Sequence, residues 1–250
     1  MNNEDKMICN RFIEAANNCY HRSMPVTTDF LDLYKQSLFN SIVKDLPPVH
    51  HMVMGGYDLA ERKLILFLPE KDYPFEFPFT VLKIIPSNSK FAEELTHRDY
   101  LGSILNLGIT RDKIGDILIC KNEVFLFCTN NIADFLTDNI TKIRHTYVIV
   151  SKVEPRNFNY EPEFEEITGT IASLRLDAVI ALGFHNSRNH IITYIEEGKV
   201  AVNGRIITSN AYNICPGDII SVRGLGKIKF DGTITETKKG RLFTKIFKYI

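Results

Sequence analysis

Residues 174–204 read LRLDAVIALGFHNSRNHIITYIEEGKVAVNG, and this stretch decides the fold of the C-terminal part of the chain. Near its start, Leu176, Val179 and Ile180 fall on one face of a helix, because they recur at the spacing of helical turns. Gly183 follows, and glycine is the residue that most readily ends a helix in the left-handed conformation. The pattern predicts a short helix that packs against a core through one face.

A second short helix is expected directly afterwards. Ser187 suits its N-cap position, and Gly198 suits the position just after its last turn. Between them, Ile191, Ile192 and Ile195 form an apolar stripe. The sequence therefore predicts a pair of short helices that share one core.

The rest of the C-terminal part has the pattern of strands and tight turns. Asn203-Gly204 is the strongest short signal for a two-residue hairpin, and Pro216-Gly217-Asp218 predicts a turn into a strand over 219–223. Over 243–249, Phe, Lys, Phe and Tyr occupy alternate positions, which is typical of a strand. We expect a small α+β domain over residues 170–250.

The net charge of zero conceals a division of the chain into a basic and an acidic part. Residues 171–250 contain 12 Lys and Arg against 6 Asp and Glu, a net charge of +6. The other 170 residues carry 18 basic and 24 acidic groups, a net charge of −6. A basic domain on an acidic chain predicts a localised surface that binds a polyanion.

The start of the second predicted helix suits a phosphate, because Arg188 there lies beside free backbone N–H groups and the positive end of the helix dipole. Arg188 has no evident carboxylate partner nearby in the sequence. For Arg175 there are two alternatives: it forms a local ion pair with Asp177, or it contacts a phosphate of the polyanion, which we expect to be RNA. Ser187 serves either as a cap alone or also as an RNA contact, and the lysines of the last strands either contact RNA or protect a sheet edge. The residues expected to contact RNA are Arg175, Ser187, Arg188, His190, Lys199, Arg205, Arg223 and Lys227.

Residues 1–72 are expected to form a helical unit with a hairpin. Apolar residues recur at helical spacing over 12–20, and a second helix is expected over 28–43 with the capping pair Thr28-Asp29 at its start. Two strands joined through a Gly-Gly turn are expected over 49–54 and 63–68.

Residues 73–155 are expected to form a ferredoxin-like domain, the arrangement also used by RNA-recognition motifs. Aromatic residues on the central strands of such a domain can stack bases, and Phe125 and Phe127 are candidates. Alternation with Val124, Leu126 and Cys128 leaves both faces of that strand apolar, which favours core packing instead. The βαββαβ order comprises strands over 79–85, 116–120, 123–128 and 146–153 with helices over 90–107 and 132–140.

Residues 156–169 are acidic, follow a proline, and are expected to be a linker. The five cysteines have neither the spacing of a zinc site nor that of a redox pair, and we expect reduced thiols. No apolar run reaches the roughly 20 residues that span a bilayer, and the N-terminus lacks the pattern of a signal peptide. We expect a monomeric cytoplasmic protein that uses no cofactor.

Motifs of catalysis are incomplete in this chain. His97-Arg98-Asp99 is similar to the start of a kinase catalytic loop, but Ile104 occupies the position of the required asparagine. Gly224-Leu225-Gly226 lacks the third glycine of a dinucleotide site, and His50-His51 lacks a third metal ligand at close spacing. These patterns favour a binding protein over an enzyme.

The C-terminal motifs resemble the S-four RNA-binding domain, named for a protein of the small ribosomal subunit. The resemblance rests on Arg175-Leu176-Asp177, Gly183, Ser187-Arg188, Gly198 to Gly204 and Gly217-Asp218, in matching order over about 50 residues. Nearly the whole chain resembles the bacterial YlmH-like proteins, through segments that also include Gly55-Gly56-Tyr57, Ala60-Glu61-Arg62, His97 to Gly102, Ile114 to Ile117 and Ser221 to Lys227.

The resemblance implies RNA binding on the large ribosomal subunit carrying peptidyl-tRNA, during quality control of stalled translation. It also implies RNA contacts by Arg175, Ser187, Arg188, Lys199 and Arg205, and encoding near cell-division genes. Two alternatives are an RNA-modifying enzyme of the pseudouridine synthase or methyltransferase type and a protein adaptor linked to cell division. The first needs a catalytic aspartate in a large sheet domain or a cofactor-binding glycine loop, and neither is evident.

Overall fold

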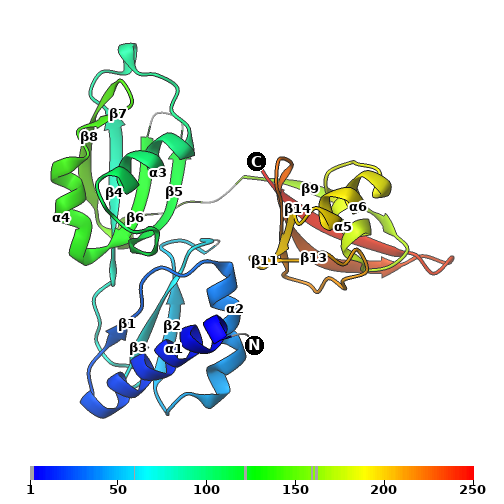
Figure 1. Ribbon diagram of the computed structural model, residues 1–250, viewed down its shortest axis with the longest axis horizontal. Coiled ribbons are helices and arrows are strands. Elements are labelled where there is room, and N and C mark those ends of the chain that lie inside the picture. The colour runs from blue at the N-terminus through cyan, green and yellow to red at the C-terminus, as the bar shows by residue number, and fades with distance from the viewer. Residues whose placement is uncertain (1–2, 59, 121–122, 159, 161–162) are drawn as a thin grey trace. The chain divides into compact units, whose positions relative to one another are not determined.

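The computed structural model describes residues 3–58, 60–120, 123–158, 160 and 163–250 (Figure 1). The chain divides into two compact units, Met1–Tyr160 and Glu161–Ile250. The first unit contains the predicted helical and ferredoxin-like parts, and the second contains the predicted basic domain. The boundary expected at residues 72 and 73 stays a prediction.

The N-terminal part of the first unit packs two helices against a small antiparallel sheet. Helix α1 (Asn3–Arg22) and helix α2 (Leu33–Ile42) enclose a core with the sheet, in which Phe12, Phe39 and Phe67 meet edge to face. The sheet has the strand order β1-β3-β2, with bounds Val26–Thr27, Leu64–Leu68 and His50–Met54. The hairpin of β2 and β3 agrees with the sequence, whereas the two-residue β1 was not predicted.

The second helix begins later than the sequence suggested, because Asp32 caps α2 by accepting a hydrogen bond from the Lys35 amide at 2.8 Å. Thr28 is used differently: its amide donates to the Ile65 carbonyl at 2.9 Å, and its hydroxyl accepts from the Ile65 amide at 2.9 Å. The expected cap at Thr28-Asp29 is therefore wrong. Thr28 continues the pairing of β1 with β3 by one residue, and its hydroxyl replaces a backbone carbonyl as the acceptor for the Ile65 amide.

The central part of the first unit has the predicted ferredoxin-like topology. Its sheet has the order β5-β6-β4-β8-β7, and all neighbouring pairs are antiparallel. Helix α3 (His97–Asn106) starts after the capping residue Thr96, so the first part of the expected helix over 90–107 is a short 3-10 turn, Ser89–Phe91, and extended chain. Helix α4 spans Asn130–Asn139. The strand bounds are Phe79–Pro86 for β4, Ile114–Cys120 for β5, Glu123–Thr129 for β6, Lys142–Ile143 for β7 and Thr146–Val153 for β8.

The two faces of this sheet are covered by different partners. Helices α3 and α4 pack on one face through Ile104 and Leu136, which are both fully buried (Figure 1). On the other face, Phe127 is fully buried in a cluster with Phe30 from the N-terminal part. Phe158, beyond the end of β8, packs against Phe127 at 5.1 Å between ring centroids. The prediction that Phe127 belongs to the core rather than to a base-stacking surface is confirmed.

A polar network joins the N-terminal part to β5 of the central sheet. The Asp116 carboxylate accepts from the Tyr57 hydroxyl at 2.6 Å and from the backbone amides of Glu61 and Arg62 at 2.7 and 3.1 Å. The Arg62 guanidinium donates in turn to three carbonyl oxygens, including that of Ile114 at 2.8 Å. Burial and the nearby Asp116 carboxylate raise the pKa of Tyr57, so its hydroxyl remains a donor at neutral pH.

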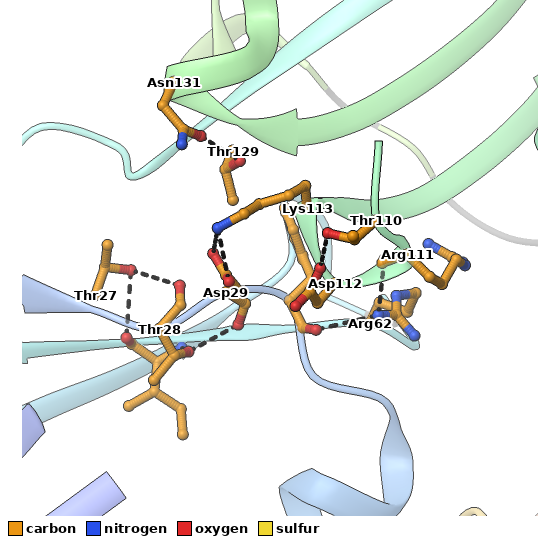
Figure 2. Close-up of polar contacts among 12 residues, drawn as sticks. Thr27, Thr28, Asp29, Arg62, Thr110, Arg111, Asp112, Lys113, Thr129 and Asn131 are labelled. Atoms are coloured by element: carbon orange, nitrogen blue, oxygen red, sulfur yellow. Dashed lines mark hydrogen bonds and ion pairs between the residues drawn. The ribbon is translucent and has the colours of Figure 1, made fainter. Parts of the chain in front are cut away.

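The same contact region carries an ion pair between sequence-distant residues. The Lys113 ammonium reaches both oxygens of Asp29 at 2.6 and 2.7 Å, as Figure 2 shows. Beside it, Arg111 donates to the carbonyls of Ile114 and Gly115, and burial lowers the pKa of Arg111 to about 10. These polar groups and the Phe30–Phe127 cluster hold the two parts of the first unit together.

The second unit is a six-stranded antiparallel sheet with two helices on one face (Figure 1). Helices α5 (Leu176–Gly183) and α6 (Arg188–Glu196) agree with the predicted pair. The sheet order is β11-β10-β12-β13-β14-β9. The strand bounds are Phe164–Ile171 for β9, Val200–Val202 for β10, Arg205–Ile206 for β11, Ile219–Val222 for β12, Gly226–Glu236 for β13 and Leu242–Tyr249 for β14.

The expected linker over 156–169 is wrong at both ends, for physical reasons. At its start, Phe158 packs on the central sheet. At its end, β9 pairs with the full length of β14, so that Ile167 is buried opposite Ile246. Two of the acidic residues that suggested a linker, Glu165 and Glu166, belong to β9, and Glu165 pairs across the strands with Lys248 at 2.8 Å.

Candidate nucleic-acid interface

A buried carboxylate lies between the two helices of the second unit. Asp177, in the first turn of α5, has only 1% of its side chain exposed. Arg188, the first residue of α6, donates to its Oδ2 from Nη2 at 2.5 Å and from Nε at 3.2 Å. Arg175, the N-cap residue of α5, donates from Nε to Oδ1 at 3.1 Å. One carboxylate thus gathers two guanidinium groups at the junction of the helices.

The two arginines keep this carboxylate ionised. Burial alone would raise the pKa of Asp177, but the hydrogen bonds and positive charges of Arg188 and Arg175 outweigh burial and lower it. The interpretation of Arg188 as lacking a carboxylate partner is therefore wrong. For Arg175, the alternative of an ion pair with Asp177 is what the structure shows. The side chains of Arg188 and Arg175 are still 49% and 37% exposed, although both bond a carboxylate that is buried.

The local sequence explains why Arg188 begins a helix at this position. The Ser187 hydroxyl accepts from the His190 amide at 3.3 Å, as expected of the N-cap residue. Asn186 strengthens the turn, because its side-chain oxygen accepts from the Ser187 amide at 2.9 Å and lies 2.9 Å from Nδ1 of the exposed His190. Ser187 and His190 therefore organise the end of the helix that carries Arg188.

Further cations lie at the other end of α6. Lys199 pairs with Glu197, and its ammonium also lies 5.3 Å from the centre of the Tyr194 ring. The backbone amide of Arg223 donates to the Lys199 carbonyl at 2.9 Å, which fixes the two residues side by side. The His190 and Tyr194 rings meet edge to face at 5.0 Å. Tyr194 thus contacts both His190 near the start of α6 and Lys199 beyond its end, and Arg223 is adjacent to Lys199.

A well-defined hairpin positions Arg205 beyond Lys199. Asn203 and Gly204 both have positive φ angles, 48° and 77°, as the turn between β10 and β11 requires. The Asn203 amide group donates to Asp218 at 2.8 Å, which ties the hairpin to the start of β12. Arg205 is exposed on β11, and within the described parts of the chain its side chain forms no ion pair.

Lys227 occupies a different place from the other predicted cations. It lies on β13, with its ammonium 5.6 Å from the centre of the Tyr249 ring on β14. The predicted residues therefore fall in three places: Arg175, Ser187, Arg188 and His190 at the starts of α5 and α6, Lys199, Arg205 and Arg223 beyond the end of α6, and Lys227 on β13. Sequence reasoning missed two residues of this interface: Asp177, the shared partner of two arginines, and Tyr194, whose ring contacts Lys199. The contact of Tyr194 with His190 could have been found, because residues four apart on a helix are neighbours.

Membrane-spanning helices and metal-ligand clusters are two further features that bear on function. Among the described residues, no helix has both the length and the apolar character that crossing a membrane requires. In the same residues, no group of three or more His, Cys, Asp or Glu side chains is arranged to hold a metal ion. His50 and His51 are neighbours on β2, where burial and the adjacent His50 lower the pKa of His51.

Two family models match separate parts of this chain. Residues 72–157 match a model described as the putative RNA-binding domain in YlmH. Residues 174–220 match the S4 domain, which contains both helices and the hairpin of the interface. The small ribosomal subunit protein uS4 of Kosmotoga olearia is 33% identical over 92 residues, which cover 35% of this chain and 44% of that protein.

Two longer similarities each cover more than half of the chain. The cell division protein ylmH from Streptococcus pneumoniae has a similar fold, with a TM-score of 0.50 and 23% identity over 62% of this chain and 93% of that one. The ribosome-associated protein quality control protein P2 of Bacillus subtilis is 32% identical over 218 residues, covering 86% of this chain and 83% of that protein. With both family models in the expected order, the chain belongs to the YlmH-like family that includes this Bacillus subtilis protein.

Proposed function

We propose that this protein binds structured ribosomal RNA without catalysing a reaction, and that it acts during quality control of stalled translation. The binding site in this proposal is on the large ribosomal subunit carrying peptidyl-tRNA. Support comes from the match to an RNA-binding domain model, the match to the S4 domain, and the similarity to a ribosome-associated quality control protein. The basic C-terminal part, with a net charge of +6 over residues 171–250, suits an RNA ligand.

The observation that carries the proposal is the pair of guanidinium groups held by Asp177. A guanidinium can donate two parallel hydrogen bonds to a phosphate, but a free arginine loses conformational entropy when it does so. Here Asp177 fixes Arg175 and Arg188 before RNA arrives, while 37% and 49% of their side chains stay exposed. Two ordered cationic groups beside a helix start form a site for the phosphate backbone of a folded RNA.

The remaining cations extend this site along α6 and the hairpin. Lys199 and Arg223 are adjacent through a backbone hydrogen bond of 2.9 Å, and Arg205 is exposed beyond them. Contacts of this kind position RNA through phosphates and carry little sequence information, which suits recognition of an RNA shape. In this proposal the surface recognises the contour of a ribosomal RNA helix or of a tRNA.

The test reverses two exposed charges that have no part in the Asp177 cluster. The double variant Arg205→Glu and Arg223→Glu should bind a ribosomal RNA stem-loop more weakly, and the slope of log Kd against log salt should fall by about 1 for each phosphate that is no longer neutralised. Binding is measured by fluorescence anisotropy at several salt concentrations. The matched control, Lys44→Glu with Lys71→Glu, makes the same change in net charge on exposed residues of the first unit.

Equal effects of the two double variants would show that net charge alone matters and would contradict the assigned site. Sedimentation with purified subunits tests the location, because the proposal requires the protein to travel with the large subunit and the Arg205 and Arg223 variant to be released from it. Nucleoside analysis of the ribosomal RNA after incubation tests the absence of catalysis, since a new modified nucleoside would overturn that part.

A further inference from the structure

The sheet of the second unit has a second face that the S4 helices do not cover. Helices α5 and α6 pack on the inner face, where Ile167, Ile228 and Ile246 are buried on three neighbouring strands. The residues that alternate with them belong to the outer face, because side chains of a strand point to opposite sides in turn. We call this outer surface the aromatic–lysine face, and it comprises Phe164, Lys227, Lys229, Lys245, Phe247 and Tyr249.

Three aromatic rings lie together on this face. Phe164 on β9 pairs in register with Tyr249 on β14, and their ring centres are 5.0 Å apart. Phe247, two residues along β14, has its ring centre 5.8 Å from that of Phe164. All three side chains are partly exposed. Such cross-strand ring pairs stabilise the sheet, and their exposed parts also offer flat apolar surface on which a ligand can stack.

Lysines accompany the rings on the same face. The Lys227 ammonium lies 5.6 Å from the centre of the Tyr249 ring, and that of Lys245 lies 5.2 Å from the centre of the Phe247 ring. Lys229 on β13 is in register with Phe247. Glu166 on β9 lies 3.3 Å from Lys245, and the exposed Asp231 continues the alternation of Lys227 and Lys229 on β13, so three lysines stand against two carboxylates among these described residues. Positive charge therefore dominates the aromatic surface.

We propose that the aromatic–lysine face binds an unpaired segment of RNA. Bases would stack on Tyr249 and Phe247, and the ammonium groups of Lys227 and Lys229 would meet the phosphates between them. Because a lysine stem is flexible, its ammonium can leave a ring for a phosphate and uncover the ring for a base. This inference rests on the proposed function, since it assigns a second surface for the same class of ligand.

Charge and chemistry favour RNA over a protein on this face. The core of a protein interface is depleted of lysine, because burying an ammonium without a partner is unfavourable. Unpaired RNA supplies what both residue types need, with flat bases for the rings and phosphates for the ammonium groups. The helical side around Arg188 would hold folded RNA by its backbone, and the outer face would hold a neighbouring single strand.

The test uses the full-length protein and an oligouridylate of roughly 12 nucleotides, a length in the range of known single-stranded sites. The variant Phe247→Leu with Tyr249→Leu keeps apolar side chains on β14 but removes the rings. Base stacking on aromatic side chains is sequence-tolerant and strong, so we expect the Kd for oligouridylate to rise about tenfold or more. The control Tyr20→Leu removes a 49% exposed ring from α1 of the first unit and should leave this Kd unchanged.

The same two probes separate this inference from the proposed function. The leucine variant should keep its affinity for the ribosomal RNA stem-loop, whereas Arg205→Glu with Arg223→Glu should lose stem-loop affinity and keep most oligouridylate affinity. If only the stem-loop loss appears, the outer face is refuted and the helical site stands. If only the oligouridylate loss appears, the outer face stands and the helical site is refuted.

A direct measurement on the wild-type protein tests the proposal even if the leucine variant fails to fold. Oligouridylate carrying 5-iodouridine is bound to the wild-type protein and irradiated, and the attached peptide is identified by mass spectrometry. We expect attachment at Phe247, Tyr249 or Phe164. Attachment elsewhere, no binding by the wild-type protein at low salt, or a leucine variant that changes self-association but not RNA affinity would each overturn the proposal.

Discussion

The proposed function gives Asp177 a role in RNA binding that needs no contact with RNA. Only 1% of its side chain is exposed between the two helices, and its two oxygens accept from Arg175 and Arg188. A carboxylate near phosphates would ordinarily repel them, but here it lies behind two guanidinium groups that outnumber its charge. We interpret Asp177 as a positioning residue, which orders the two cations and holds the start of α6 against the start of α5.

The first prediction concerns Asp177→Asn. The amide retains one acceptor oxygen but loses the charge that two arginines share, so we expect the unfolding free energy of the second unit to fall by about 1–3 kcal/mol. The loss should be smaller than for a fully buried ion pair, because both arginine side chains are partly solvated. Chemical denaturation measures it. Asp231→Asn, the same change at an exposed position of β13, should have an effect near zero.

The pH dependence of the same variant follows from the lowered pKa of Asp177. A carboxylate with a lower pKa in the folded state stabilises the protein above its unfolded pKa of about 3.9, and this contribution disappears as the pH falls through the folded value. The wild-type protein should therefore lose more stability than Asp177→Asn between about pH 5 and the acid limit of folding. Parallel stability curves for the two proteins would contradict the ionised state of Asp177.

Single residues show where sequence reasoning succeeded and where it failed. The helix start at Arg188 and the hairpin at Asn203 were predictable, because capping and turn preferences act within a few residues. The partner of Arg188 was not predictable in this way, because Asp177 lies 11 residues earlier and meets it only when two helices pack. The contact of Lys227 with the Tyr249 ring was not predictable for the same reason, because Tyr249 lies 22 residues later on another strand.

At the scale of elements, strands with mixed composition were the difficult ones. The ferredoxin-like order was predictable because its strands are rich in apolar and β-branched residues, as over 81–85 and 124–128. β9 was mistaken for linker because Glu165 and Glu166 precede its buried Ile167, and their lysine partners on β14 lie some 80 residues away. β1 has two residues, and only its pairing with β3 identifies it as a strand.

A close approach of two elements gives a prediction in the first unit. Gly56 follows β2 with a φ of 96°, and a Cβ atom there would lie 2.1 Å from Cε1 of Phe127 on β6. Gly56→Ala should destabilise the first unit by about 2–4 kcal/mol, since it adds overpacking to backbone strain. Gly102→Ala is the control, because a Cβ on α3 meets nothing within 4 Å and alanine favours a helix. Thermal denaturation should show opposite shifts for the two variants.

At the scale of the whole molecule, each compact unit has hydrophobic clusters of its own. We therefore expect two unfolding transitions in calorimetry, one for each unit. Gly56→Ala should lower the transition of the first unit and leave the other in place, and Asp177→Asn should do the reverse. A single transition that both substitutions shift by the same amount would contradict this assignment.

The position of Phe158 has a practical consequence for anyone who divides this chain. Its ring caps Phe125 at 5.0 Å and Phe127 at 5.1 Å, although it belongs to a stretch whose composition suggests a tether. A recombinant fragment that ends at residue 155 would leave both phenylalanine rings exposed to solvent, and exposed rings on a sheet promote aggregation at the concentrations used for spectroscopy. The cut belongs after Tyr160, where the first compact unit ends.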